Sequence, residues 1–201
     1  MDFPHLSFTG PPIDDAEVLD KLPAELVALL RDRNGVIALS GGFHLRGACT
    51  TPGWHSLRAA MDGPMALRRL FPEMKPTDVP FAEEACGDQF LLRDGVVHRL
   101  AAETGDIGSL ELPLAPFLER VRDDGVATLN LEPLLAFLEA GHHLEPGQLL
   151  SVFPPFILTA SESGVTLKAV PAVERLVFLA DLARQLHDLP DGAEITFKTV
   201  P

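Results

Sequence analysis

The sequence predicts an α+β protein with a central, largely antiparallel sheet flanked by helices. Three observations predict this class. The dipeptide Asp94-Gly95 separates two short apolar runs, which is the pattern of a β-hairpin. Several stretches repeat apolar residues at helical spacing, the longest of them between 172 and 187. The expected strands and helices also follow one another without regular strand-helix-strand alternation, which argues against a doubly wound parallel sheet.

The N-terminal region should begin with an irregular arm over residues 1–15, which hold three prolines and a glycine without periodicity. A helix is predicted from about Pro23 to Arg33, because proline suits the first helical turn. Asn34-Gly35 should end that helix, since glycine readily adopts the left-handed conformation. Val36–Leu39 is predicted as a short strand, followed by a glycine turn. Two further helical segments are expected, at 54–60 and at 65–70.

The middle of the chain carries the clearest strand signal. The hairpin should pair Phe90–Leu92 with Val96–Leu100, since both central positions of a type I′ turn need positive φ. Another turn is expected at 103–106, and two helices at 114–121 and 132–140. The first of these helices should carry four apolar residues on one side, Leu114, Phe117, Leu118 and Val121.

The last quarter should contain strands at 149–153, 165–170 and 194–200, and one long helix at 172–187. Pro154-Pro155 marks the end of the first of these strands. The helix should bury a stripe made of Val173, Leu176, Val177, Ala180, Ala183 and Leu186. These strands and the helix between them are expected to extend the central sheet or to form an added lobe.

Length and composition indicate one globular unit over residues 1–201. The chain is 46% hydrophobic and 22% charged, so it can bury a core without a metal or a disulfide. Cys49 and Cys86 lie far apart and outside any metal-ligand spacing, which favours two free thiols, with one bridge as the alternative. The sequence shows no signal peptide and no apolar run of about 18 residues. We therefore expect a cytoplasmic protein without a membrane partner.

The net charge of −13 argues against nucleic-acid binding, which needs a basic surface. Residues 81–140 hold twelve acidic residues against four arginines, a net charge of −8. This stretch is either a solvated surface or an acidic face that steers a basic protein partner. On the second interpretation Glu83, Glu84 and Asp88 are the first candidates for partner binding. Trp54, the single tryptophan, is either a core residue or a partly exposed binding anchor.

Familiar catalytic motifs are absent from the sequence: it has no GxSxG, P-loop, GxGxxG, HExxH or CxxC. His142-His143 is the one histidine cluster, and adjacent side chains diverge rather than converge on an ion. His44 and His55 could flank Cys49 as a Cys–His pair, although a buried structural cysteine is favoured.

The carboxylates just before the hairpin could serve a glycosidase or hold a cation. One tryptophan and no tyrosine leave little for stacking on sugars, however. We expect no catalytic residue, no cofactor and no metal.

The order of these features resembles the SMI1/KNR4 (SUKH) superfamily. The helix that opens with Leu22-Pro23-Ala24-Glu25-Leu26 is similar to the entry helix of that family. The similarity continues through the Gly-Gly turn before Phe43-His44-Leu45-Arg46, the Trp54 helix, the stretch Phe81–Phe90 running into Asp94-Gly95, the turn Glu103-Thr104-Gly105 and the helix from Leu114. The resemblance covers about residues 17–122. Residues 126–201 lie outside it as a C-terminal extension.

The resemblance implies an α+β fold and a role in protein binding. Many bacterial members of the superfamily are immunity proteins that neutralise a cognate toxin, and others are regulators or scaffolds. The family has no shared catalytic residues. We therefore expect a non-enzymatic binding module, an immunity protein that occludes or distorts a toxin's active site. Two alternatives stay open: a small-molecule-binding protein or hydrolase with dispersed site residues, and a regulatory or scaffold subunit.

Overall fold

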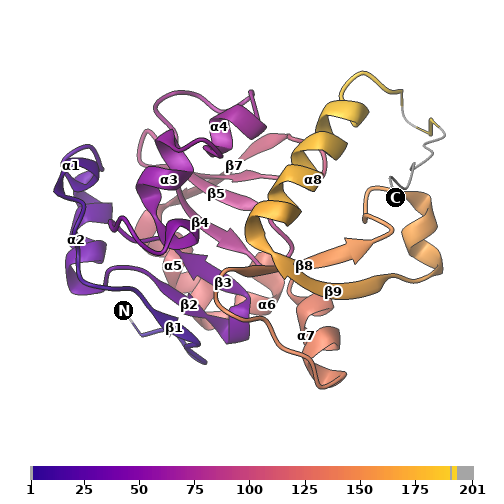
Figure 1. Ribbon diagram of the computed structural model, residues 1–201, viewed down its shortest axis with the longest axis horizontal. Coiled ribbons are helices and arrows are strands. Elements are labelled where there is room, and N and C mark those ends of the chain that lie inside the picture. The colour runs from indigo at the N-terminus through magenta and orange to yellow at the C-terminus, as the bar shows by residue number, and fades with distance from the viewer. Residues whose placement is uncertain (1, 191, 194–201) are drawn as a thin grey trace.

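The computed structural model describes residues 2–190, 192 and 193, so the strand predicted at 194–200 lies outside the described residues. Within that part of the chain, seven strands form an antiparallel meander, in which each strand pairs with the next in sequence (Figure 1). We call this the main sheet. Its strands are β1 (Phe8–Thr9), β2 (Val36–Ala38), β3 (Phe43–Leu45), β4 (Val79–Glu84), β5 (Gln89–Arg93), β6 (Val96–Leu100) and β7 (Ile107–Pro113).

Another antiparallel pair, β8 (Gln148–Phe153) and β9 (Thr166–Pro171), lies beside the main sheet. The helices of the described chain are α1 (Ala16–Leu19), α2 (Ala24–Asp32), α3 (Leu57–Asp62), α4 (Leu67–Leu70), α5 (Leu114–Asp123), α6 (Gly125–Leu129), α7 (Glu132–Glu139) and α8 (Ala172–Leu186). In Figure 1, α3, α4 and α8 lie over one face of the main sheet, while α5 and α6 lie behind it. The α+β class with a central antiparallel sheet is thus confirmed.

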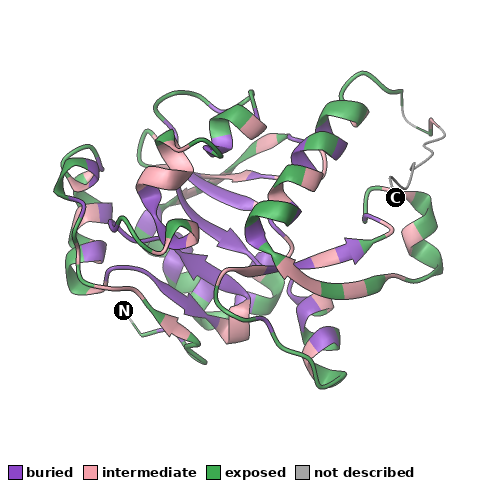
Figure 2. Ribbon diagram, in the orientation of Figure 1, coloured by how far each residue is buried: buried purple, intermediate pink, exposed green. Residues whose placement is uncertain are grey.

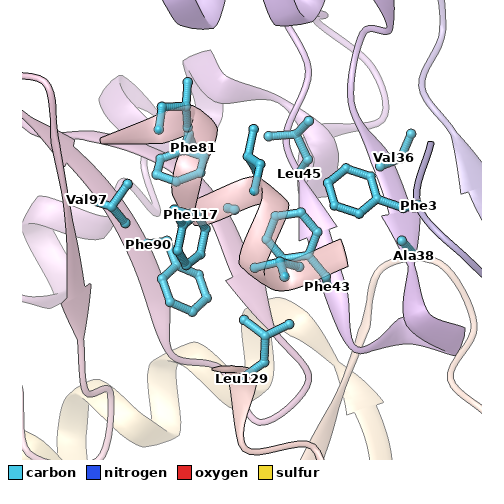
Figure 3. Close-up of a cluster of buried hydrophobic side chains, with 14 of the residues drawn as sticks. Phe3, Val36, Ala38, Phe43, Leu45, Phe81, Phe90, Val97, Phe117 and Leu129 are labelled. Carbon is cyan, nitrogen blue, oxygen red and sulfur yellow. The ribbon is translucent and has the colours of Figure 1, made fainter. Parts of the chain in front are cut away.

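The larger core lies between the main sheet and α5. Phe117 of α5 is fully buried, and its ring centroid lies 4.8 Å from that of Phe90, 5.9 Å from Phe81 and 6.4 Å from Phe43 (Figure 3). The predicted inner side of this helix is confirmed, because its four expected apolar residues are all buried. A smaller core on the opposite face joins α4 and α8 to β5 and β6, with Leu91 and Leu179 among its members.

A bulge in β4 decides which of its side chains face which helices. The register pairs Pro80 with Leu91 and then Ala82 with Phe90, so Phe81 is the extra residue. Phe81 and Ala82 both join the larger core. The next residue, Glu83, therefore points to the opposite face of the sheet, the side covered by α8.

The hairpin predicted from Asp94-Gly95 is confirmed: β5 and β6 pair antiparallel across it, with Arg93 opposite Val96. Asp94 and Gly95 have φ of 52° and 78°, as a turn matched to the twist of the strands requires. Most of the other predicted segments are also found, with ends that shift by a few residues.

Four strands lie where no strand was predicted. β1 falls in the expected irregular arm, β3 directly after the predicted glycine turn, β4 in the proline-broken stretch, and β7 after the turn at 103–106. Two short helices, α1 and α6, were also missed. Each of these elements is short or carries proline or charged residues. Its formation therefore depends on contacts with neighbouring elements rather than on the local preference of its own residues.

The buried stripe of α8 was predicted in the wrong register. Ala180 and Ala183 are buried as expected, but Val173 is 51% exposed and Val177 43% exposed. The helix instead buries Ala172, Arg175, Leu179 and Leu182 along with those two alanines (Figure 2). The prediction failed because it treated an arginine as a surface residue. The Nε atom of Arg175 donates to the carbonyl of Cys86 at 3.2 Å.

Candidate functional site

A row of polar side chains crosses the main sheet on the face covered by α8. The strand register places His44 of β3 opposite Glu83 of β4, and Glu83 opposite Gln89 of β5. All three side chains are buried, with 0–6% of their surface exposed. Side chains opposite one another on antiparallel strands lie within contact distance, so the register alone brings these groups together.

Arg46, just past the end of β3, neutralises the carboxylate in this row. Its Nη2 donates to Glu83 Oε2 at 2.7 Å and to Gln89 Oε1 at 2.7 Å, and its Nη1 donates to the carbonyl of Pro80 at 3.1 Å. Burial alone would raise the pKa of Glu83, but the charge of Arg46 and the contact with His44 hold it at about 2. The site therefore holds a buried ion pair.

A chain of ring nitrogens leads away from this ion pair. His44 Nδ1 lies 2.7 Å from Glu83 Oε1, and His44 Nε2 lies 2.8 Å from His55 Nδ1. His55 Nε2 lies 3.0 Å from the carbonyl oxygen of Asn34. Burial, with a contribution from His44, lowers the pKa of His55 to about 4. Burial also lowers the pKa of His44, against the opposing effect of Glu83.

The ring of His55 is held in a cage of glycine backbone. A Cβ atom added at Gly10 would lie 2.5 Å from His55 Nε2, one at Gly35 would lie 2.5 Å from Cε1, and one at Gly47 would lie 2.7 Å from Nε2. These glycines let three backbone segments approach the ring closely. Trp54 lies beside the histidines, with its ring centroid 5.4 Å from His44 and 5.6 Å from His55.

Above the polar row lies a surface pocket of about 290 Å³, which we call the Trp54 pocket. Arg46 and Glu83 contribute polar groups to its lining. The rest of its wall is largely apolar and comes from the Trp54 turn, α3, the following loop, α4 and the start of α8. Its lining comprises Arg46, Gly53, Trp54, Ser56, Ala59, Ala60, Pro64, Met65, Leu67, Glu83, Ala172, Val173 and Leu176.

The prediction of an exposed acidic surface is wrong for Glu83 and Glu84. Glu83 and Glu84 are each only 3% exposed, because both lie in β4 between paired strands. The Glu84 carboxylate accepts from the backbone N–H groups of Cys86 and Asp88, at 2.9 and 2.8 Å, and so holds the β4–β5 turn. Burial, reinforced by Asp88, raises the pKa of Glu84 to about 8.

Asp88 is half-buried and ion-paired. Its Oδ2 accepts from Arg99 Nε at 2.7 Å, and its Oδ1 accepts from the backbone N–H of Ala102 at 2.9 Å. This carboxylate therefore joins the β4–β5 turn to β6 and to the turn that follows it. Trp54, by contrast, is half-buried and lines its pocket, so its predicted role as an anchor stays a prediction.

The other candidate groups are separated in the structure. Cys49 and Cys86 are free thiols, as predicted. Burial and the nearby Asp14 raise the pKa of Cys49 to about 11, which opposes formation of a nucleophilic thiolate. Both ring nitrogens of His44 are already taken, by Glu83 and by His55, so His44 makes no Cys–His pair.

The adjacent histidines diverge. His142 stacks on Phe137 with ring centroids 5.0 Å apart, while His143 contacts Glu145 at 2.8 Å. In the described part of the chain, no three His, Cys, Asp or Glu side chains are grouped so that they could hold a metal ion.

Sequence reasoning missed the polar row. No sequence motif joins the residues of this row, and their spacing does not predict that they lie together. They are His44, Arg46, His55 and Gln89. The available signal was a set of polar residues inside strand-like runs, where a buried polar group needs a partner. The three glycines around His55 are a second signal, but their role can be recognised only once the structure is known.

Comparisons with known proteins show the fold alone. No family model and no curated protein matches this sequence. Among solved structures, the chain is similar to Atu4351 from Agrobacterium tumefaciens, with a TM-score of 0.52 and 17% sequence identity. The alignment covers 89% of this chain and 84% of that one. In the described part of this chain, the helices lack the combination of length and apolar character that crossing a bilayer would require.

Proposed function

We propose that this chain is a non-enzymatic protein-binding module and that its recognition site is the Trp54 pocket. The observation that carries the proposal is a largely apolar pocket beside a half-buried tryptophan. Tryptophans that line an apolar depression are common sources of binding energy in protein interfaces. The pocket suits one or two apolar side chains of a partner.

The surface around the pocket supports this role. Met65 and Val173, which line it, are 40% and 51% exposed. Val177, one helical turn beyond Val173 on α8, is 43% exposed. Together they extend the apolar surface beyond the pocket itself, and clustered exposed apolar side chains often mark an interaction site.

The partner that we propose is a basic protein. The chain has a net charge of −13, and opposite net charges accelerate the encounter of two proteins. Long-range attraction of this kind depends on the whole charge distribution and does not need Glu83 or Glu84 at the surface. The resemblance to the SMI1/KNR4 superfamily makes the proposal more specific: an immunity protein that covers the active site of a cognate toxin.

The test uses the product of the neighbouring open reading frame as the partner. Val173→Asp places a charge on the edge of the pocket, at an exposed position where the fold tolerates it. We expect binding to weaken at least about tenfold, which corresponds to about 1.4 kcal/mol, and protection in a co-expression assay to fall with it. The matched control is Leu135→Asp on α7, a 40% exposed leucine outside the pocket lining. If the two changes had equal effects on binding, or if neither had any, the interface would lie on another face of the protein.

One observation favours a second candidate, a small-molecule-binding protein. The pocket combines apolar walls with the charged groups of Arg46 and Glu83, and ligand sites commonly join apolar lining to a few placed polar groups. Saturable binding of small apolar probes, detected by a change in Trp54 fluorescence and abolished by Val173→Asp, would favour this candidate over the protein partner.

A further inference from the structure

The hydrogen-bond chain below the Trp54 pocket needs one more proton than its neutral rings carry. Its contacts run from Glu83 Oε1 to His44, from His44 to His55, and from His55 to a backbone carbonyl. Both ends, an ionised carboxylate and a carbonyl oxygen, only accept hydrogen bonds. Each of the three contacts therefore needs a ring N–H, whereas two neutral imidazoles supply only two.

The missing proton cannot come from the carboxylate. Glu83 is bound by Arg46 and Gln89 at 2.7 and 3.1 Å through its other oxygen, and its low pKa keeps it ionised. Arg46 and Glu83 neutralise each other, so the ion pair leaves the histidines without a net counter-charge. An added proton must therefore be held by the two rings themselves.

The rings cannot turn away to relieve the shortage. Gly10, Gly35 and Gly47 surround the outer edge of His55, and Phe8 lies against the ring at a centroid distance of 5.0 Å. The ring of His44 lies edge to edge with that of His55, with the ring centroids 5.1 Å apart and the ring planes 21° from parallel. In the neutral pair, two acceptor atoms must face each other at one of the three contacts.

The other charged groups near the pair are few. The small cavity beside His44 is lined by Glu83 and Glu84 of β4 and by Glu145 from the loop before β8, and Glu145 already contacts His143. Arg46 opposes protonation of both rings, Glu83 favours it, and Phe8 and Trp54 on the remaining sides are uncharged.

We propose that the His44–His55 pair is an acid sensor that takes up a single proton, which completes the hydrogen-bond chain and fixes the turn that carries Trp54. The added proton supplies the third N–H, so that each contact has one donor. His55 is then bonded to the carbonyl of Asn34 and ties the Trp54 turn to the start of β2. The proposal concerns the fold and stands whether or not the pocket binds a protein.

The test follows the two rings and the single tryptophan through a pH titration. In protein with ¹⁵N-labelled histidine, we expect His44 and His55 to change together, with one proton taken up below the ordinary imidazole pKa of about 6.5. Trp54 emission should change in the same step, since an imidazolium quenches an indole in contact with it. His55→Asn keeps an amide donor for His44 but cannot titrate, so it should abolish the step. His187→Asn, at an exposed histidine beyond α8, should keep it.

Two results would overturn the proposal. One is separate titration of the two rings with one proton each. The other is the absence of any change in either ring down to about pH 3, one unit below the lowered pKa of His55, while the protein stays folded. If His55→Asn fails to fold, the labelled parent protein decides alone, because its ring nitrogen shifts report protonation directly.

Discussion

The buried ion pair between Arg46 and Glu83 gives the sharpest test of the site. The two side chains are each 4% exposed, and their closest contact is 2.7 Å. Arg46→Met would remove the cation and leave a carboxylate buried without a counter-charge. Breaking a buried pair in this way typically costs about 3–5 kcal/mol, a large part of the roughly 5–15 kcal/mol that stabilises a domain. The measurement is urea unfolding at neutral pH, followed by circular dichroism.

Two controls make the result interpretable. The double change Arg46→Met/Glu83→Gln removes both charges, so it should be less destabilising than Arg46→Met alone. Arg122→Met breaks an exposed pair with Asp123, where solvent screens the charges, and should leave the unfolding midpoint unchanged. If Arg46→Met behaved like Arg122→Met, Glu83 would not be a buried, paired carboxylate, and the exposed acidic surface would have to be reconsidered.

Three further predictions follow from the packing around the site. Gly147→Ala should destabilise more than Gly95→Ala: both residues have positive φ, but only at Gly147 would the added Cβ meet the tryptophan ring, at 2.9 Å. Equal unfolding midpoints would show that this ring is not tightly packed. Leu179→Ala should lower the free energy of unfolding by about 2–5 kcal/mol and Val177→Ala by less than about 0.5 kcal/mol. The reverse order in thermal unfolding would show that α8 buries the stripe predicted from sequence. Because the pKa of His55 is lowered to about 4, the folded state binds a proton on this ring less tightly than the unfolded state does. The free energy of unfolding should therefore be highest above about pH 6.5 and should fall on acidification, by on the order of 3 kcal/mol. His55→Asn should flatten this pH dependence of unfolding.

The elements that could be predicted from sequence are those fixed by local chemistry. The hairpin at Asp94-Gly95 was found because its turn residues must adopt positive φ, whatever surrounds them. The inner side of α5 was found because its apolar residues alone satisfy helical spacing. β4 could not be found in this way, since Pro80, Glu83 and Glu84 are poor strand residues in isolation. Their pairing with β3 and β5 decides the structure.

The candidate site was out of reach for a related reason. Its polar groups come from β3, β4, β5 and the Trp54 turn, and they meet only through strand register and one bulge. A shift of one residue in β4 would turn Glu83 toward the opposite face of the sheet. Arg175 misled the prediction of α8 in the same way, because a buried arginine is unusual and its partners lie far away in sequence. A single sequence contains no record of such distant contacts.

The Trp54 pocket depends on both parts of the chain, and this bears on where specificity resides. Its charged lining, Arg46 and Glu83, comes from the main sheet, but part of its wall comes from Val173 and other residues at the start of α8, in the C-terminal extension. The extension meets the rest of the chain here through Gly147, which lies against the tryptophan ring. Within the extension, the N–H of Ala172 donates to the carbonyl of Gly147 at 2.9 Å and so holds the start of α8 at the same place. A chain without residues 126–201 would lack this wall, and the face of the main sheet that carries the ion pair would lose the cover of α8. If the pocket is the recognition site, the extension therefore takes part in choosing the partner.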